Sequence, residues 1–232
     1  MLTTNAFDLA ALDMAGTTID DGGAVYAALR GAVEDQIDAP LDDDVVQRWT
    51  GTSKREAVAG LLLSATGAAP APTVAAVYQN FAVRLTKAYA ATPPRPLPGV
   101  SAAMEEMRGR GVKVILQTGY SREVATSILD AMGWQQDTHI DGMVTTDEVR
   151  TSRPAPYLIF HAMELAGVHS PERVLVAGDT ANDLLAGSNA GARFVVGVLT
   201  GAYDAATLGA VRHTHLLPSA ANIPALLRRT AS

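Results

Sequence analysis

Several side chains able to do acid–base or nucleophilic chemistry stand where short apolar segments of the 232-residue sequence end. A short apolar run bounded by Gly or Thr is typical of a buried strand, and open α/β sheets bind ligands at the carboxyl ends of their strands. The apolar runs are residues 9–12, 112–116 and 174–177. The polar residues after them are Asp13, Thr118, Asp179 and Asp183. We therefore expect these four side chains to meet at one edge of a sheet.

Asp13 is the candidate nucleophile. It opens the segment Asp13-Met14-Ala15-Gly16-Thr17-Thr18. Gly16 allows the backbone to come close to an anion, and Thr17 and Thr18 carry hydroxyl and amide donors for it. The alternative is an aspartate that only starts a turn after a strand.

Two further segments are suited to bind an anion. Thr118-Gly119-Tyr120 offers a hydroxyl and a close-approach glycine just before the amino terminus of an expected helix, where anions are stabilised. Arg153 stands before Pro154 in a proline-rich loop that holds a guanidinium for bidentate contact with a phosphate.

The acidic residues predict a divalent metal site. Carboxylates that converge on an anionic substrate repel it unless a cation neutralises them, and hard oxygen ligands suit Mg²⁺. We expect Asp13 and Asp179 to be direct ligands and the main-chain carbonyl of Ala15 to be a third, with Asp183 acting directly or through water. The alternative for Asp179 and Asp183 is that they cap a helix and place negative charge in its first turn.

Strands and helices alternate along the second half of the chain, and this alternation predicts a parallel sheet. Helices are expected over residues 101–110, 122–132, 157–166 and 183–190, and strands over 112–116, near 143–144, over 174–177 and over 194–198. With the strand at residues 9–12, this pattern predicts an α/β fold with a Rossmann-like core.

The first strand is separated from the others by a segment with helical periodicity. Val25, Leu29, Val33 and Ile37 recur at every fourth residue, and no strand pattern occurs between positions 24 and 91. The proline-rich residues 93–99 mark a boundary, because repeated proline continues neither a helix nor a strand ladder. We expect a catalytic core of residues 1–21 and 93–232, with residues 22–92 forming an all-helical cap over Asp13.

Composition limits the partners of the chain. The formal net charge of −6 gives no basic surface of the kind that nucleic acid or an anionic membrane requires. The sequence has no cysteine, so it contains no disulfide or thiolate metal site. Because no basic leader and no apolar stretch of membrane-spanning length is present, we expect a cytoplasmic protein.

The order of these motifs, with a helical insertion after the first strand, resembles the haloacid dehalogenase superfamily over nearly the whole chain. Two departures are more specific. Most members carry a second aspartate two residues after the nucleophile, where this chain has Ala15, and most use lysine where this chain has Arg153. The combination of Asp-x-Ala-Gly-Thr with arginine resembles the phosphonatase branch, the phosphonoacetaldehyde hydrolases and their close relatives.

That branch has a lysine in the cap that forms an imine with the substrate aldehyde, and Lys54 matches its position. Ser53 to Glu56 fits a capping box, which places Lys54 at the first helical position. The helix dipole and the neighbouring Arg55 should lower the pKa of Lys54. The alternative is a solvated surface lysine. The histidine found three residues later in the branch is Ala57 here, which leaves Glu56 or Tyr120 to move protons.

The resemblance implies a magnesium-dependent hydrolase that cleaves the carbon–phosphorus bond of phosphonoacetaldehyde or a closely related 2-oxoalkylphosphonate. An imine on Lys54 and an aspartyl phosphate on Asp13 are the implied intermediates. The implied catalytic residues are Asp13, Lys54, Arg153 and Thr118, and the implied substrate-binding residues are Gly16, Thr17, Gly119 and Tyr120.

The resemblance also implies a homodimer joined through the cap, for which the apolar face from Val25 to Ile37 is long enough. Two other functions stay open. One is a phosphatase of small phosphomonoesters that uses Asp13 without the imine. The other is a catalytically silent member that binds phosphorylated ligands.

Overall fold

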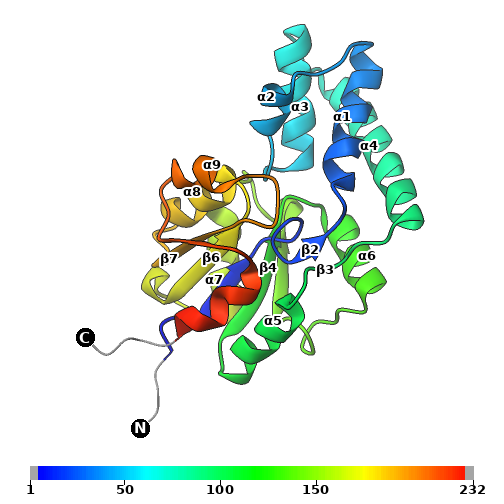
Figure 1. Ribbon diagram of the computed structural model, residues 1–232. Helices are drawn as coiled ribbons and strands as arrows, with labels where there is room; N and C mark the ends of the chain where they lie inside the picture. The colour runs from blue at the N-terminus through cyan, green and yellow to red at the C-terminus, as the bar shows by residue number, and fades with distance from the viewer. Residues whose placement is uncertain (1–4, 228–232) are drawn as a thin grey trace.

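The computed structural model describes residues 5–227 and contains a six-stranded parallel sheet in the order β5-β4-β1-β6-β7-β8, flanked by helices (Figure 1). The predicted α/β class is confirmed. The strands are β1 (Leu9–Leu12), β4 (Lys113–Thr118), β5 (Gly142–Thr145), β6 (Val174–Gly178), β7 (Phe194–Val198) and β8 (His215–Leu217).

The register of the sheet brings the predicted motifs to one edge. Leu12 of β1 pairs with Leu116 of β4 on one side and with Ala177 of β6 on the other, and all three strands are parallel. Their carboxyl ends therefore lie next to one another, and the residues that follow them emerge together.

Both faces of the sheet are covered by helices, which explains why its strands read as nearly continuous apolar runs. Leu158 and Ile159 of α7 pack with Leu9 of β1 on one face, whereas Met104 of α5 packs with Leu12 on the other. The helices of this part are α5 (Val100–Gly109), α6 (Arg122–Met132), α7 (Tyr157–Ala166), α8 (Ala181–Asn189) and α9 (Ala205–Gly209), with the 3₁₀ helices η1 (Thr146–Glu148), η2 (Pro171–Arg173) and η3 (Ala220–Leu227).

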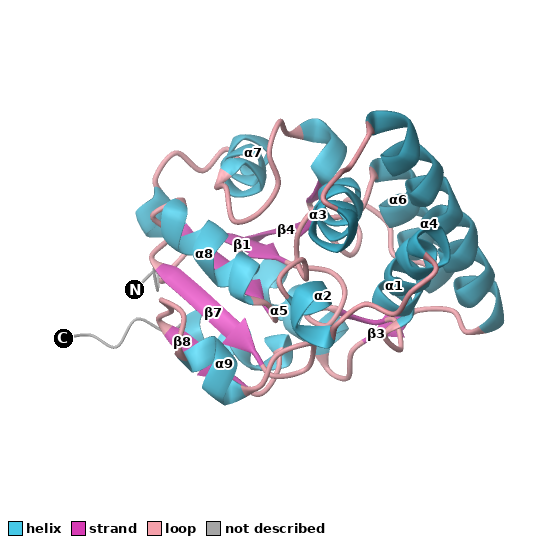
Figure 2. Cartoon of the chain, turned by 90° about the horizontal axis from the view of Figure 1, so that it is seen from above, coloured by secondary structure: helices cyan, strands magenta, loops and turns pink. Residues whose placement is uncertain are grey.

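Four consecutive helices form a group that stands over the carboxyl ends of the strands in Figure 1, and Figure 2 looks down on it. They are α1 (Ala24–Ile37), α2 (Asp43–Gln47), α3 (Lys54–Thr66) and α4 (Ala71–Ala91). Val25, Leu29 and Val33 of α1 are buried within the chain itself, so the apolar face considered for a homodimer is not free. The division of the chain at residues 22 and 92 and the homodimer stay predictions.

Two local features differ from the sequence expectation. The proline-rich run was expected to form no ladder, but β3 (Arg95–Pro96) pairs antiparallel with β2 (Ile19–Asp20). Proline is tolerated there because a two-stranded ribbon leaves edges on which an N–H is not required. Helix α8 begins two residues early because Thr180 caps it.

Of the described helices, none is long and apolar enough by itself to cross a membrane. Among them, only α3 and α4 taken together, which are bent relative to each other, reach that length and apolar composition.

Candidate active site

Three acidic side chains converge at the carboxyl edge of the sheet, as the motif spacing predicts. Oxygen atoms of Asp13, Asp179 and Asp183 lie within 4.8 Å of one another, and all three residues are buried. Asp13 follows β1, Asp179 follows β6, and Asp183 lies in the first turn of α8. This set of hard oxygen donors is of the kind that holds Mg²⁺.

The electrostatics of the cluster also fit a cation. Burial raises the pKa of Asp13 to about 6, with Asp183 adding to the shift and Arg153 opposing it. Burial, and then the charges of Asp13 and Asp183, raise the pKa of Asp179 to about 8. Arg153 alone does not offset the burial of these carboxyls, and a divalent ion would supply further positive charge.

Asp179 is held by neutral donors from two loops. Its Oδ1 accepts a hydrogen bond from Thr17 Oγ1 at 3.1 Å, and its Oδ2 accepts one from the Ala202 amide at 2.7 Å. Gly16 has a φ of +78°, and a Cβ on it would lie 2.6 Å from Asp179 Oδ2, so a glycine is required at this contact. The loop containing Ala202 was not predicted as part of the site.

Two residues expected to bind substrate have other partners in the structure. The Thr17 hydroxyl orients Asp179, and the Gly16 amide donates to the Ile19 carbonyl at 2.8 Å. The short turn after β1 uses these donors to close on itself, since buried backbone amides need partners. The neighbouring Thr18 hydroxyl likewise donates to the Asp13 carbonyl at 2.8 Å. The expected Ala15 carbonyl ligand lies in this same turn and stays a prediction.

Asp183 makes the helix cap that the sequence offered as one alternative, and its role as a metal ligand stays a prediction. It forms a capping box with Thr180, whose amide donates to Asp183 Oδ2 at 3.1 Å. Its other oxygen, Oδ1, accepts a hydrogen bond from Arg153 Nη1. One oxygen of Asp183 therefore caps α8 while the other faces the cluster.

Arg153 ties the nucleophile to this cluster. Its Nη1 donates to Asp13 Oδ1 at 2.7 Å as well as to Asp183 Oδ1, and its side chain is buried. Burial lowers the pKa of Arg153, but the charges and hydrogen bonds of Asp183 and Asp13 together raise it above its ordinary value, so Arg153 stays charged. Its Nε is buried without a hydrogen-bond partner among the described residues. A buried unpaired donor beside a nucleophile suits an oxyanion of the substrate.

Lys54 is the first residue of α3, as predicted, and its side chain faces inward. The Ser53 side chain accepts a hydrogen bond from the Glu56 amide, so the expected cap is present. The Glu56 carboxylate does not return to Ser53 but accepts from the Ser152 amide at 3.2 Å, which connects α3 to the loop of Arg153. Lys54 is only 5% exposed, which excludes the solvated surface lysine.

The environment of Lys54 favours a free amine. Its Nζ donates to the Thr52 carbonyl at 3.1 Å and lies 5.4 and 5.6 Å from the ring centroids of Tyr26 and Tyr120. Burial, and then the positive charge of Arg153, lowers the pKa of Lys54 to about 8. The expected direction is therefore correct, but Arg55 is not among the causes of the shift. Its guanidinium lies 4.6 Å from the ring centroid of Tyr78.

The comparisons with known proteins agree with this geometry. A family model described as haloacid dehalogenase-like hydrolase matches residues 7–191. The chain belongs to this family. This match and the relatives described next confirm the resemblance to the superfamily and to its phosphonatase-like branch that the motifs indicated.

Curated relatives include phosphonoacetaldehyde hydrolases. The protein of that name from Bacteroides fragilis is 34% identical over 128 residues, which is 54% of this chain and 46% of the relative. The one from Bacillus cereus is 37% identical over 110 residues, 47% of this chain and 40% of the relative. The matched segment thus spans less than half the length of these relatives.

Solved structures support the fold. A hydrolase from Pseudomonas syringae is 24% identical, with a TM-score of 0.83, and the match covers 97% of this chain and 100% of that one. A phosphonoacetaldehyde hydrolase-like protein from Oleispira antarctica is 21% identical, with a TM-score of 0.80, and the match covers 97% of this chain and 93% of that one.

In this haloacid dehalogenase-like hydrolase, the loop before α3, residues 50–53, packs directly against the loops at the carboxyl edge of the sheet. The Lys54 amide donates to the Gly119 carbonyl at 3.3 Å, and Asn182 Nδ2 donates to the Thr50 carbonyl at 2.7 Å. A Cβ on Gly119 would overlap the Thr52 carbonyl oxygen. Gly119 therefore makes room for the loop that carries Lys54, whereas its expected contact with substrate stays a prediction. Thr118, whose Oγ1 accepts from the Tyr120 amide at 3.2 Å, lies beside it.

The substitution Gly119→Ala tests this close approach. We expect it to lower the free energy of unfolding by about 1–3 kcal/mol, because a methyl group overpacks a tight contact. The matched control is Gly109→Ala in α5, where nothing lies within 4 Å of the added Cβ and alanine favours the helix. Urea denaturation of both variants gives the comparison. Equal stability of the two variants would show that the loop is free to move off the core.

Sequence reasoning missed several residues that complete the site. Tyr26 packs against Lys54, and its hydroxyl accepts from the Gly51 amide at 3.1 Å. The Tyr203 hydroxyl lies 2.7 Å from Thr50 Oγ1 and so fixes the other end of the same loop. Spacing gives no sign of these contacts, since each joins segments far apart in the chain.

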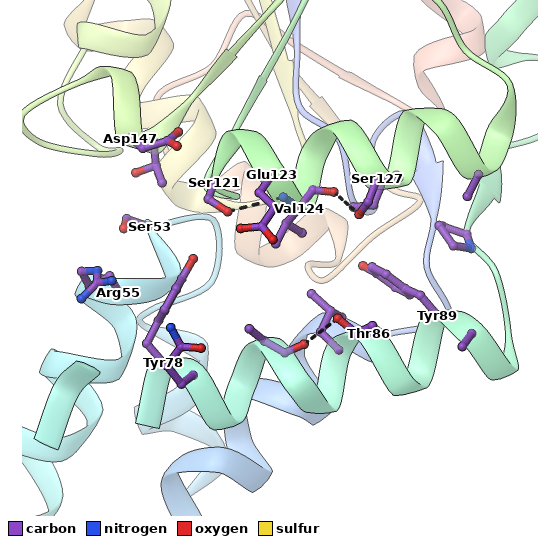
Figure 3. A pocket seen from close by; sticks show the side chains of 18 residues that line it. Ser53, Arg55, Tyr78, Thr86, Tyr89, Ser121, Glu123, Val124, Ser127 and Asp147 are labelled. Carbon is purple, nitrogen blue, oxygen red and sulfur yellow. Dashed lines mark hydrogen bonds between the residues drawn. The ribbon is translucent and has the colours of Figure 1, made fainter. Parts of the chain in front are cut away.

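A cavity of about 860 Å³ opens beside Lys54, between α4 and α6 (Figure 3). Ser53, next to Lys54, lines it together with Arg55 and Tyr78. Tyr89 lines it from α4, and its hydroxyl lies 3.2 Å from that of Tyr120. The cavity therefore borders the neighbours of Lys54, whereas Lys54 itself and the three aspartates do not line it.

Proposed function

We propose that this hydrolase cleaves the carbon–phosphorus bond of phosphonoacetaldehyde or a closely related 2-oxoalkylphosphonate. The observation that carries the proposal is a lysine that is only 5% exposed and whose amide is hydrogen-bonded to the Gly119 carbonyl at the carboxyl edge of the sheet. Burial and the charge of Arg153 lower its pKa to about 8. The matches to proteins named phosphonoacetaldehyde hydrolase support the same substrate class.

The chemistry requires the amine because a carbanion is a poor leaving group. The free amine of Lys54 attacks the aldehyde carbon, water is lost, and a protonated imine forms. When the carbon–phosphorus bond breaks, its electron pair moves into the imine, so an enamine leaves instead of a carbanion. Protonation of the enamine carbon and hydrolysis of the imine release acetaldehyde and restore Lys54. An enamine needs no proton from an acid as it departs, which agrees with Ala15 in place of a second aspartate.

Asp13 is the group that receives the phosphoryl unit. Its carboxylate attacks phosphorus, and water later hydrolyses the aspartyl phosphate. Arg153, through its unpaired Nε, and Thr118, through its hydroxyl, neutralise charge on the phosphoryl oxygens. A magnesium ion held by Asp13, Asp179 and Asp183, with the Ala15 carbonyl, would supply further charge neutralisation when bound.

Borohydride trapping with phosphonoacetaldehyde tests the proposal. We expect a reduced adduct on Lys54, identified by peptide mass, and magnesium-dependent release of phosphate when borohydride is omitted. Because only the unprotonated amine attacks, the initial rate of trapping should rise with pH and reach half its maximum near the Lys54 pKa of about 8. The peptide containing the exposed Lys87 is the internal control and should stay unmodified. Phosphate release without an adduct would contradict imine chemistry.

A phosphomonoester phosphatase is the second candidate, because the carboxylate cluster and Arg153 are assembled without any contribution from Lys54. Its alkoxide leaving group needs an acid, which Ala15 does not supply. Turnover of sugar phosphates that is unchanged by substitution of Lys54 would favour this function. Absence of phosphate release from a panel of phosphonates and phosphate esters would favour the silent, ligand-binding alternative.

A further inference from the structure

A chain of hydrogen bonds leads from the aromatic side chains around Lys54 to a carboxylate outside the acidic cluster. The hydroxyls of Tyr120 and Tyr89 lie 3.2 Å apart, and the Tyr89 hydroxyl donates to Asp21 Oδ2 at 3.3 Å. Tyr120 is buried, whereas Tyr89 and Asp21 are half-buried. We propose that this Tyr120–Tyr89–Asp21 chain is a proton relay that serves imine formation at Lys54. The relay rests on the proposed function.

Imine formation needs both removal and return of a proton. The ammonium form of Lys54 must lose a proton before it attacks, and the hydroxyl of the resulting carbinolamine must gain one before it leaves as water. Of the nearby side chains, Glu56 is engaged by the Ser152 amide, and Ala57 carries no titratable group. Two tyrosine rings lie near the amine: the Tyr26 centroid is 5.4 Å and the Tyr120 centroid 5.6 Å from Lys54 Nζ. The Tyr26 hydroxyl accepts from the Gly51 amide, whereas the Tyr120 hydroxyl is the one joined to Tyr89.

The proposed transfer balances without any further reactant. The proton lost by the Lys54 ammonium passes through Tyr120 and Tyr89 to the Asp21 carboxylate. Attack of the amine on the aldehyde gives the carbinolamine. When its carbon–oxygen bond breaks, the same proton returns along the chain to the departing hydroxyl, which leaves as water. The products are the protonated imine, water and the Asp21 carboxylate in its original state.

The two tyrosines are suited to transmit a proton rather than to lose one. Burial raises the pKa of both hydroxyls well above that of a free tyrosine. Each hydroxyl therefore accepts a proton on one side as it donates its own on the other, and no tyrosinate accumulates. The carboxylate at the end of the chain is the only member that stores the proton.

Asp21 also has a structural role that any test must separate from the relay. Its Oδ1 accepts from the Gly23 amide at 3.0 Å and its Oδ2 from the Val25 amide at 3.1 Å, at the start of α1. Asp20 makes the same kind of contact, with the Gly22 amide at 3.0 Å, but its carboxylate faces Arg95 at 3.9 Å. Asp20→Asn is therefore the matched control for Asp21→Asn.

Tyr89 has a matched control on the same helix. Figure 3 shows Tyr78 and Tyr89 on α4, both lining the cavity, and the Tyr78 ring is stacked on Arg55 rather than joined to Tyr120. Tyr78→Phe removes a hydroxyl from the cavity wall without touching the hydrogen-bond chain. Asp21 is itself only half-buried, so a small acid such as formate can reach the end of the relay from solvent.

The experiment measures the rate of imine formation by rapid quenching with borohydride, with phosphonoacetaldehyde as the probe and the Lys54 peptide as the readout. We expect Tyr89→Phe and Asp21→Asn each to slow adduct formation by about 10²-fold, the usual contribution of a positioned proton-transfer group. Tyr78→Phe and Asp20→Asn should keep the rate of the unsubstituted protein. Added formate should restore the rate of Asp21→Ala in proportion to its concentration, which a purely structural role of Asp21 does not predict.

Three results would overturn the relay. Adduct formation at an unchanged rate in Tyr89→Phe and Asp21→Asn removes the relay while leaving the imine in place. If Asp20→Asn slows adduct formation equally, the slowing comes from a disturbed start of α1. The same holds if formate does not restore the rate of Asp21→Ala. Absence of an adduct in the unsubstituted protein overturns the proposed function, and the relay with it.

Discussion

Replacing Lys54 by arginine is expected to abolish borohydride trapping and to lower kcat/KM for phosphonoacetaldehyde by about 10³-fold or more. A guanidinium stays protonated at every pH at which the protein is folded, so it provides no free amine for the aldehyde. Phosphate release in the presence of magnesium gives the rate, and peptide mass gives the adduct. Trapping that persists in Lys54→Arg would place the imine on another lysine.

A second variant shows that such a loss is not caused by unfolding. Lys54→Met is expected to raise the free energy of unfolding at pH 7 by about 1–3 kcal/mol. The folded-state pKa of Lys54, about 8, lies below the ordinary value of 10.5, so at pH 7 folding forces a charged amine into a buried site.

The stability gained in Lys54→Met should depend on pH in a defined direction. The cost of burying the charged Lys54 amine is fully present below pH 8, because Lys54 is then protonated in both the folded and the unfolded protein. It declines as the pH rises from about 8 towards 10.5, where the unfolded chain binds more protons than the folded one. The advantage of Lys54→Met should decline over the same range. Lys87→Met, at an exposed position of α4, should leave the stability unchanged within about 0.5 kcal/mol. A less stable Lys54→Met protein would contradict the buried-amine assignment.

Local signals in the sequence were sufficient for the core and for the position of Lys54. Helices α6 and α7 and strand β7 occupy the residues expected from periodicity and capping signals. Ser53 caps α3 as its spacing to Glu56 predicts, because this interaction spans only three residues. The strand ends could be placed for the same reason, since an apolar run followed by Asp or Thr is a local pattern.

Interactions between distant segments could not be predicted in this way. The contact of Tyr89 with Asp21 joins residues 68 positions apart, and the one of Ser152 with Glu56 joins residues 96 positions apart. The hydrogen-bond partners of Gly16 and Thr17, the Ile19 carbonyl and the Asp179 carboxylate, could not be predicted because they depend on how the turn closes on the loop after β6. Local propensity fixes which elements form, but their packing decides which donors stay free.

Replacing Asp13 by asparagine is expected to lower phosphate release by at least about 10⁴-fold while leaving borohydride trapping intact. The amide cannot attack phosphorus, so no aspartyl phosphate forms, but Lys54 still condenses with the aldehyde. The variant therefore separates the two halves of the proposed reaction. Loss of both activities together would indicate that Asp13 acts mainly by organising the site.

The fold should tolerate this change, because burial makes the ionised form of Asp13 unfavourable in the folded protein. Its folded-state pKa of about 6 lies above the ordinary 3.8, so at pH 7 the buried carboxylate opposes folding, and a neutral amide relieves that cost. Arg153 keeps Asp183 as a partner. The matched control is Asp8→Asn, at the other end of β1, where the carboxylate is paired with Arg173 near the surface. That variant should retain full phosphate release, because the ion pair it removes is remote from the carboxyl edge at which phosphorus must be attacked.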